Sequence, residues 1–134
     1  LTRSLNDSKI PLWVKVSPSL SDDQYRVLLR AFADTGVRAV IATNTLAQPI
    51  PGSPAALAGI GGVPLQPHAL AAVKILADER QRFDYPIDVI GCGGIEDGHS
   101  FRAFQDAGAK AMQYWTALIY RGPLAAALIA QEAL

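Results

Sequence analysis

The sequence predicts an α/β fold of the (β/α)8-barrel type, with about four consecutive βα units that form a half barrel. A short apolar run followed by a helical pattern occurs four times in the 134 residues, and such alternation is typical of parallel βαβ units. Polar residues and glycines gather after the strand-like runs, where barrel enzymes have their sites. A complete barrel takes roughly 250 residues, about twice this length. An open doubly wound sheet is the alternative topology.

The first unit combines a strand with a well-marked helix. Residues 12–16 are rich in β-forming side chains and are followed by Ser17-Pro18. Ser21 and Gln24 then have the spacing of a capping box. Apolar residues follow at helical spacing as far as Gly36, which is placed to end the helix.

The second unit contains the longest connection. Its strand is predicted at residues 39–42 and its helix at residues 68–80, with a Pro- and Gly-rich stretch at residues 48–67 between them. Loops of this length without structure of their own are usually lids, binding loops or disordered segments. We expect a binding loop because the stretch contains Gly59-Ile60-Gly61-Gly62, and disorder of residues 50–56 is the alternative.

The third and fourth units complete the pattern. Residues 87–90 are the third predicted strand, which leads into Gly91-Cys92-Gly93-Gly94 and a helix at residues 98–107. The fourth strand is predicted at residues 111–115, and a helix is expected from about Pro123 to the end of the chain.

Composition narrows the classes of function. Lys+Arg and Asp+Glu number 12 each, so no net charge would attract nucleic acid or an anionic membrane. No apolar run is long enough to span a bilayer. The single cysteine excludes an internal disulfide and fits a reducing compartment, while two isolated histidines make no metal-ligand pattern. We therefore expect a globular, cytoplasmic protein with no nucleic-acid partner and no metal.

Lys15 is the first candidate for a binding role. Alternation along a barrel strand places Trp13, Lys15 and Ser17 on the inner face. An inward ammonium is costly unless an anion or a strong acceptor meets it. We favour a binding role over a lysine that snorkels to solvent.

Thr43-Asn44-Thr45 places three hydrogen-bonding side chains directly after a buried strand. The amide of Asn44 offers a donor and an acceptor, which suits the edge of a planar, amide-bearing ring. A polar turn that merely caps the strand is the alternative interpretation.

Two glycine-rich turns are candidates for a phosphate site. Glycines let backbone N–H groups converge on an anion, and in barrels this site commonly forms after the seventh and eighth strands. If these are the last four units, the loops concerned are Gly91-Cys92-Gly93-Gly94 and Trp115-Thr116. A Rossmann fingerprint fails on spacing, because Glu96 stands where the third glycine is needed. For Cys92, packing between glycines is favoured over nucleophilic catalysis, since no nearby base can be identified.

Five segments in this order resemble successive C-terminal motifs of the dihydroorotate dehydrogenase family. They read V-K-V-S-P, A-T-N-T, G-I-G-G-V-P-L-Q, I-G-C-G-G-I and Q-Y-W-T-A-L-I-Y-R-G-P, and they cover the chain from about Pro11 onward. The last segment looks more like the quinone-linked class than the soluble class. The resemblance implies that residues 1–134 are the C-terminal half of an FMN-binding barrel, as a single domain or a domain fragment. Gly61 and Trp115 stand where the family usually has Ser and Tyr.

The resemblance also implies an activity and a set of roles. The family oxidises dihydroorotate to orotate in de novo pyrimidine biosynthesis, with FMN as cofactor and, in this class, a quinone as electron acceptor. The residues that match FMN contacts are Lys15, Thr43, Gly62, Gly94, Trp115 and Thr116. Asn44 and Thr45 match residues that bind the orotate ring. No catalytic residue is expected here, because the family's base (Ser or Cys) lies in the N-terminal half, so we expect the isolated chain to be inactive.

Two further readings stay open at this point. One is a non-catalytic FMN- or phosphate-binding half barrel, whose open edges predict a partner chain or self-association that completes the barrel. The other is a barrel that acts on a 2-hydroxy acid or a nucleotide, although Asn44 favours a pyrimidine-like ligand. For the full-length protein, a peripheral position on the inner membrane is the alternative to a cytoplasmic one.

Overall fold

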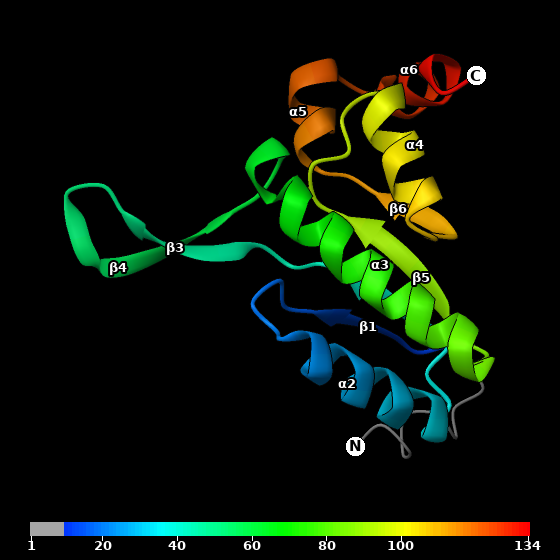
Figure 1. Cartoon of the computed structure of the whole chain (residues 1–134). Helices are drawn as coiled ribbons and strands as arrows, with labels where there is room; N and C mark the ends of the chain where they lie inside the picture. Colours follow the sequence, from blue (N-terminus) through cyan, green and yellow to red (C-terminus); the bar gives the residue numbers. More distant parts are fainter. Residues whose placement is uncertain (1–9) are drawn as a thin grey trace.

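The sheet contains four parallel strands in sequential order. The computed structural model describes residues 10–134 (Figure 1), so the first nine residues of the predicted 1–134 unit lie outside the described part. The strands are β1 (Trp13–Val16), β2 (Ala39–Ala42), β5 (Asp88–Cys92) and β6 (Ala111–Gln113), paired in the order β1-β2-β5-β6. A doubly wound sheet reverses its strand order at a switch point, whereas barrel strands follow one another. The predicted barrel-type fold is confirmed.

The connecting helices cover one face of this sheet (Figure 1). They are α2 (Asp22–Asp34), α3 (Gln66–Phe83) and α4 (Gly98–Asp106), and the short 3-10 turn η1 (Val63–Leu65) leads into α3. The predicted capping box is present, since the Ser21 hydroxyl accepts from the Gln24 N–H and the Gln24 side chain accepts from the Ser21 N–H. Helix α3 extends two residues before and three residues beyond the predicted 68–80.

Alternation along the strands separates a helix-facing side from an inner side. Val40 and Val89 pack among buried helix residues such as Leu76 on the helix-facing side. On the inner side the register aligns Lys15 with Ile41 and Ile41 with Ile90. The inner face therefore carries Lys15, as the alternation predicted.

Most of residues 48–67 lie in two strands and a 3-10 turn. The prediction that this stretch is a loop without secondary structure of its own was therefore wrong. Strands β3 (Leu46–Ile50) and β4 (Ser53–Ile60) form an antiparallel hairpin that projects from the body of the molecule (Figure 1). The tight turn uses Pro51-Gly52, with Gly52 at φ +80°. Its arms are rich in Ala and Pro and lack the β-branched alternation that marks a strand.

The C-terminal region also differs from the prediction. Strand β6 ends at Gln113, two residues earlier than expected, and residues Thr116–Arg121 form an additional helix, α5. Helix α6 (Ala125–Glu132) follows. Helix α5 is short and has no side-chain N-cap, so it has little of the signal by which a helix is recognised in a sequence. No helix within residues 10–134 combines the length and the apolar character needed to cross a bilayer.

Candidate functional site

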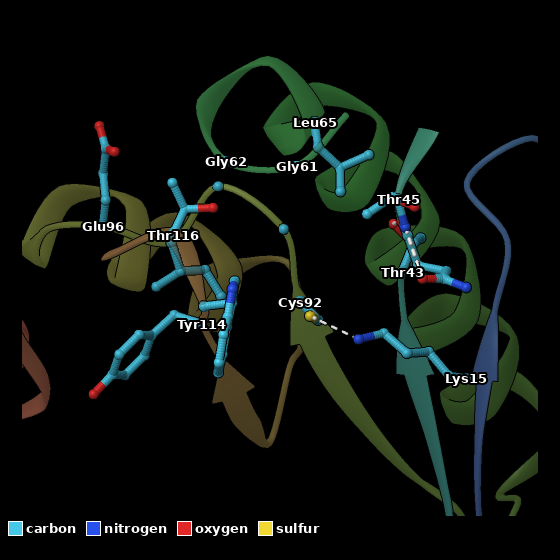
Figure 2. Close-up of a pocket in the computed structure, with 15 residues that line it drawn as sticks. Lys15, Thr43, Thr45, Gly61, Gly62, Leu65, Cys92, Glu96, Tyr114 and Thr116 are labelled. Atoms are coloured by element: carbon cyan, nitrogen blue, oxygen red, sulfur yellow. Dashed lines mark hydrogen bonds between the residues drawn. The ribbon is translucent and has the colours of Figure 1, made fainter. Parts of the chain in front are cut away.

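A pocket of about 200 Å³ lies at the C-terminal ends of the parallel strands (Figure 2). All eight residues predicted to bind cofactor or substrate line it: Lys15, Thr43, Asn44, Thr45, Gly62, Gly94, Trp115 and Thr116. They come from β1, from the segments that follow β2, β4 and β5, and from the start of α5. The structure thus brings the predicted residues together, while their individual roles stay predictions.

One side of the pocket is made by backbone. We call Gly61, Gly62, Gly93, Gly94 and Thr116 the glycine cradle. Gly62 has φ +69° and Gly94 has φ +79°, a region that favours glycine. A Cβ on Gly94 would lie 2.9 Å from the Gly62 carbonyl oxygen, and a Cβ on Gly62 would lie 3.1 Å from Thr116 Cγ2. The two turns and the start of α5 are therefore packed so closely that side chains are excluded.

The opposite side is made by side chains, and Thr43-Asn44-Thr45 is tied to strands on both sides of it. The Thr43 N–H donates to the Cys92 carbonyl at 2.6 Å, and the Asn44 N–H donates to the Val16 carbonyl at 2.8 Å. Asn44 Oδ1 accepts from the Thr45 N–H at 2.9 Å, which orients the amide. Within residues 10–134 the Asn44 Nδ2 group has no hydrogen-bond partner, so its donors are free for a ligand.

Lys15 crosses the inner face of the sheet (Figure 2). Its side chain reaches from β1 past β2, and Nζ donates to Cys92 Sγ at 3.2 Å. None of the ion pairs found in the described part of the chain involves Lys15. The ammonium therefore stands in the pocket with its charge uncompensated.

Trp115 lines the pocket while its side chain is 72% exposed. It directly precedes α5 and stands in the N-cap position of that helix. The FMN contact that the resemblance implies for Trp115 stays a prediction.

Sequence reasoning missed several lining residues, among them Leu65, Cys92, Glu96 and Tyr114. For Cys92 a signal existed, because it lies two residues beyond Ile90 and so belongs to the inner face. Leu65 and Tyr114 carry no such signal, since apolar and aromatic residues at element ends are usually core. Within residues 10–134, His, Cys, Asp and Glu side chains form no group of three suited to a metal ion.

An ion pair behind the pocket ties its segments together. Glu132 on α6 pairs with Arg121 and accepts from the Gly98 N–H at 3.0 Å, while Arg121 donates to the Glu96 carbonyl at 2.5 Å. The hydrogen bond from Arg121, followed by the Gly98 N–H, lowers the pKa of Glu132. The loop that follows the cradle is thereby linked to α5 and α6.

Comparison with known proteins decides the family. A family model described as dihydroorotate dehydrogenase matches residues 1–134. The chain belongs to the dihydroorotate dehydrogenase family. The family predicted from the motifs is confirmed.

Relatives in the dihydroorotate dehydrogenase family are similar over most of this chain. "Dihydroorotate dehydrogenase (quinone)" of Bordetella avium is 40% identical over 119 residues, which is 86% of this chain and 33% of that protein. The protein of the same name from Leifsonia xyli is 36% identical over 120 residues, 87% of this chain and 35% of its own length. The chain thus spans about a third of the length of these relatives.

Solved dihydroorotate dehydrogenase structures have the same fold. The Eimeria tenella enzyme in complex with ferulenol superposes with a TM-score of 0.80 at 30% identity, over 92% of this chain and 33% of that one. Its ligand-free form gives a TM-score of 0.77 at 31% identity, over 92% of this chain and 34% of that one. This chain is accordingly a partial barrel.

Proposed function

We propose that this chain is the C-terminal half of an FMN-dependent dihydroorotate dehydrogenase that oxidises dihydroorotate to orotate in pyrimidine biosynthesis. A quinone is the proposed electron acceptor, because the similar relatives are named dihydroorotate dehydrogenase (quinone). Residues 1–134 would supply most of the phosphate site and part of the orotate site. The catalytic base would come from the part of the barrel that precedes this chain.

The convergence of the predicted residues carries this proposal. Eight residues chosen from separate motifs between Lys15 and Thr116 line one pocket at the strand ends. That edge of the sheet is where barrel enzymes place their sites. Residues taken at random from separate segments of the chain would have no reason to gather there.

The donor set of the pocket fits FMN. At Gly62 and Gly94 the cradle is packed so closely that a Cβ would crowd its neighbours, and such glycine-rich backbone suits an anion such as a phosphate. Lys15 offers an uncompensated positive charge on the other side, and Glu96 lies far from it (Figure 2). When bound, FMN supplies a hydride acceptor for dihydroorotate.

The chain's own residues would orient both molecules. The cradle and Trp115 would hold the phosphate through backbone donors. Lys15 and Thr43 would contact the flavin ring. Asn44, whose amide is oriented by the Thr45 N–H, would donate to the orotate ring, with Thr45 beside it.

Family membership with named enzymes counts against the alternative of a non-catalytic half barrel. The proposed partners are dihydroorotate or orotate and a quinone. Whether a partner chain or a second copy completes the barrel is a separate question, answered by measuring oligomeric state.

An FMN titration followed by flavin fluorescence tests the proposal, with riboflavin as the matched ligand that lacks the phosphate. We expect FMN to bind at least about 10-fold more tightly than riboflavin, because charge-assisted hydrogen bonds to a phosphate are strong. Inorganic phosphate should compete with FMN. Equal affinity for the two flavins would contradict the assignment of the cradle.

Turnover with dihydroorotate and a quinone is the companion measurement. We expect no rate from the 134-residue chain, because the base is absent from it. A measurable rate would show that a residue of this chain acts as the base, and would overturn that part of the proposal.

A further inference from the structure

Cys92 lines the pocket without a role in the proposed function. It is partly buried at the end of β5, and its Sγ lies 3.2 Å from Lys15 Nζ. Its backbone is clamped, because its carbonyl accepts from the Thr43 N–H at 2.6 Å and the residue pairs with Gln113 of β6. The backbone that carries the sulfur is therefore fixed within the sheet.

The flanking glycines leave this backbone little freedom. A Cβ on Gly93 would lie 2.8 Å from Leu65 Cδ2, and a Cβ on Gly91 would collide with the ring of Phe104. The strand end is therefore packed closely against Leu65 of η1 and Phe104 of α4. Between these two glycines, the Cys92 side chain projects toward the inner face, on the same side as Ile90.

The contact with sulfur has a particular effect on a lysine. A lysine side chain has many rotamers, and an exposed ammonium without a partner samples them freely. A carboxylate partner would hold the ammonium but would cancel its charge. A thiol is a weak acceptor, so it orients the ammonium and leaves its charge available to a ligand.

We propose that Cys92 is a positioning residue: its sulfur holds the Lys15 ammonium within the pocket, with the charge uncancelled, where it faces the flavin ring. This inference rests on the proposed flavin site. Its test therefore needs one measurement that uses no flavin and one that does.

The flavin-free measurement is the order parameter of the Lys15 side chain, from 13C relaxation at Cε. Lys74, an exposed lysine on α3, is the control within the same spectrum. We expect the order parameter of Lys15 to be higher than that of Lys74 in the wild type. In Cys92→Ala it should fall to the value of Lys74. Cys92→Ser should recover part of the restriction, because its hydroxyl is also an acceptor.

The flavin measurement compares affinities for FMN and riboflavin. Cys92→Ala should weaken both by the same factor, between about 2-fold and 10-fold, as expected for one modest hydrogen bond. In a Lys15→Met background the same change should have no further effect, because coupled residues are not additive. A loss confined to FMN would mean that the change acts through the phosphate side.

The outcomes separate the two hypotheses. Equal Lys15 order parameters in the wild type and Cys92→Ala would overturn the positioning role, whatever flavin does. A loss of affinity that persists in Lys15→Met would assign Cys92 to packing and would also overturn it. If the wild type bound neither flavin, the proposed function would fail and the pair would lose its flavin role, even with Lys15 restrained by Cys92.

Discussion

The two sides of the pocket are built by different means. On one side the glycine cradle is packed so closely that a Cβ added to Gly94 would lie 2.9 Å from the Gly62 oxygen. On the other side, which we call the side-chain wall, Lys15, Asn44 and Thr45 contribute functional groups, and hydrogen bonds hold those of Lys15 and Asn44. We therefore expect substitutions that add atoms to the cradle, and substitutions that remove functional groups from the wall, to weaken flavin binding.

The largest effect is expected from adding one carbon to the cradle. In Gly94→Ala the new Cβ would lie 2.5 Å from Gln66 Cβ and 2.9 Å from the Gly62 oxygen, at a φ of +79°. Strain and overpacking should lower the free energy of unfolding by at least about 2 kcal/mol. We also expect FMN affinity to fall by more than about 100-fold, as measured by urea unfolding and flavin titration.

Gly52→Ala is the matched control for this change. Gly52 has nearly the same φ, +80°, but a Cβ there would meet nothing within 4 Å. Gly52→Ala should lower the free energy of unfolding by about 1 kcal/mol through backbone strain alone. FMN affinity should be unchanged. Similar losses in the two variants would show that strain, and not the packing of the cradle, decides the effect.

A smaller effect is expected from removing the charge of the wall. Lys15→Met should weaken FMN and riboflavin equally, by about 10-fold to 100-fold, as for the loss of a charge-assisted contact. Lys74→Met on the outer helix layer is the control and should change neither affinity. If Lys15→Met weakened FMN alone, Lys15 would belong to the phosphate side, and the division between cradle and wall would need revision.

Helix α4, which begins four residues beyond Gly94, should sharpen the comparison through its cap. Asp97 caps this helix by accepting from the Ser100 N–H at 2.7 Å. Asp97→Ala should lower the free energy of unfolding by about 1 kcal/mol. It should also weaken the binding of FMN more than that of riboflavin, because α4 follows the cradle, which is proposed to hold the phosphate. Urea unfolding checks the first effect, and an unchanged stability would show that the cap is dispensable.

Protonation of Asp97 should also lower the free energy of unfolding. The hydrogen bonds from Ser100, its hydroxyl first, lower the pKa of Asp97 in the folded chain. A lowered pKa means that this stabilisation is complete above the ordinary carboxyl pKa of about 3.9. It is lost as the pH falls through the lower folded-state value. Asp97→Asn should reduce that dependence in unfolding curves measured between neutral and acid pH.

The smallest effect is expected in the hairpin, which joins the wall to the cradle. Leu57 on β4 is 66% exposed, so Leu57→Ser should change the free energy of unfolding by less than about 0.5 kcal/mol. FMN affinity should stay the same in the titration. A clear loss of affinity would mean that the hairpin takes part in binding.

The features predicted from the sequence are those with local signals. Neighbouring residues carry three such signals: the capping box of Ser21 and Gln24, the alternation that points Lys15 inward, and the polar residues after β2. The alternation of strand-like and helical segments predicted the barrel-type fold, and local signals made Lys15, residues 43–45 and the glycine-rich turns candidates. The full set of eight binding residues came from the resemblance to the family. The family motifs added their order along the chain.

The features that were missed depend on contacts between distant segments or on weak local signals. The Lys15–Cys92 hydrogen bond joins residues 77 positions apart, and no spacing rule reports it. The hairpin had one usable signal in Pro51-Gly52, a pair typical of tight turns. Its Ala-rich arms obscured that signal, since pairing between the arms, and not strand propensity, holds them extended.

The seam between β2 and β5 has a consequence for the time course of folding. These neighbours are separated by the hairpin and α3, the longest connection within the sheet. Because loop closure costs more entropy as the loop lengthens, their pairing is expected to be the last step in assembling the sheet. Both the Thr43–Cys92 and the Lys15–Cys92 hydrogen bonds cross this seam. Flavin added during refolding should therefore bind only in the slowest phase of refolding. The rate at which its fluorescence changes would then report the rate of pairing between β2 and β5.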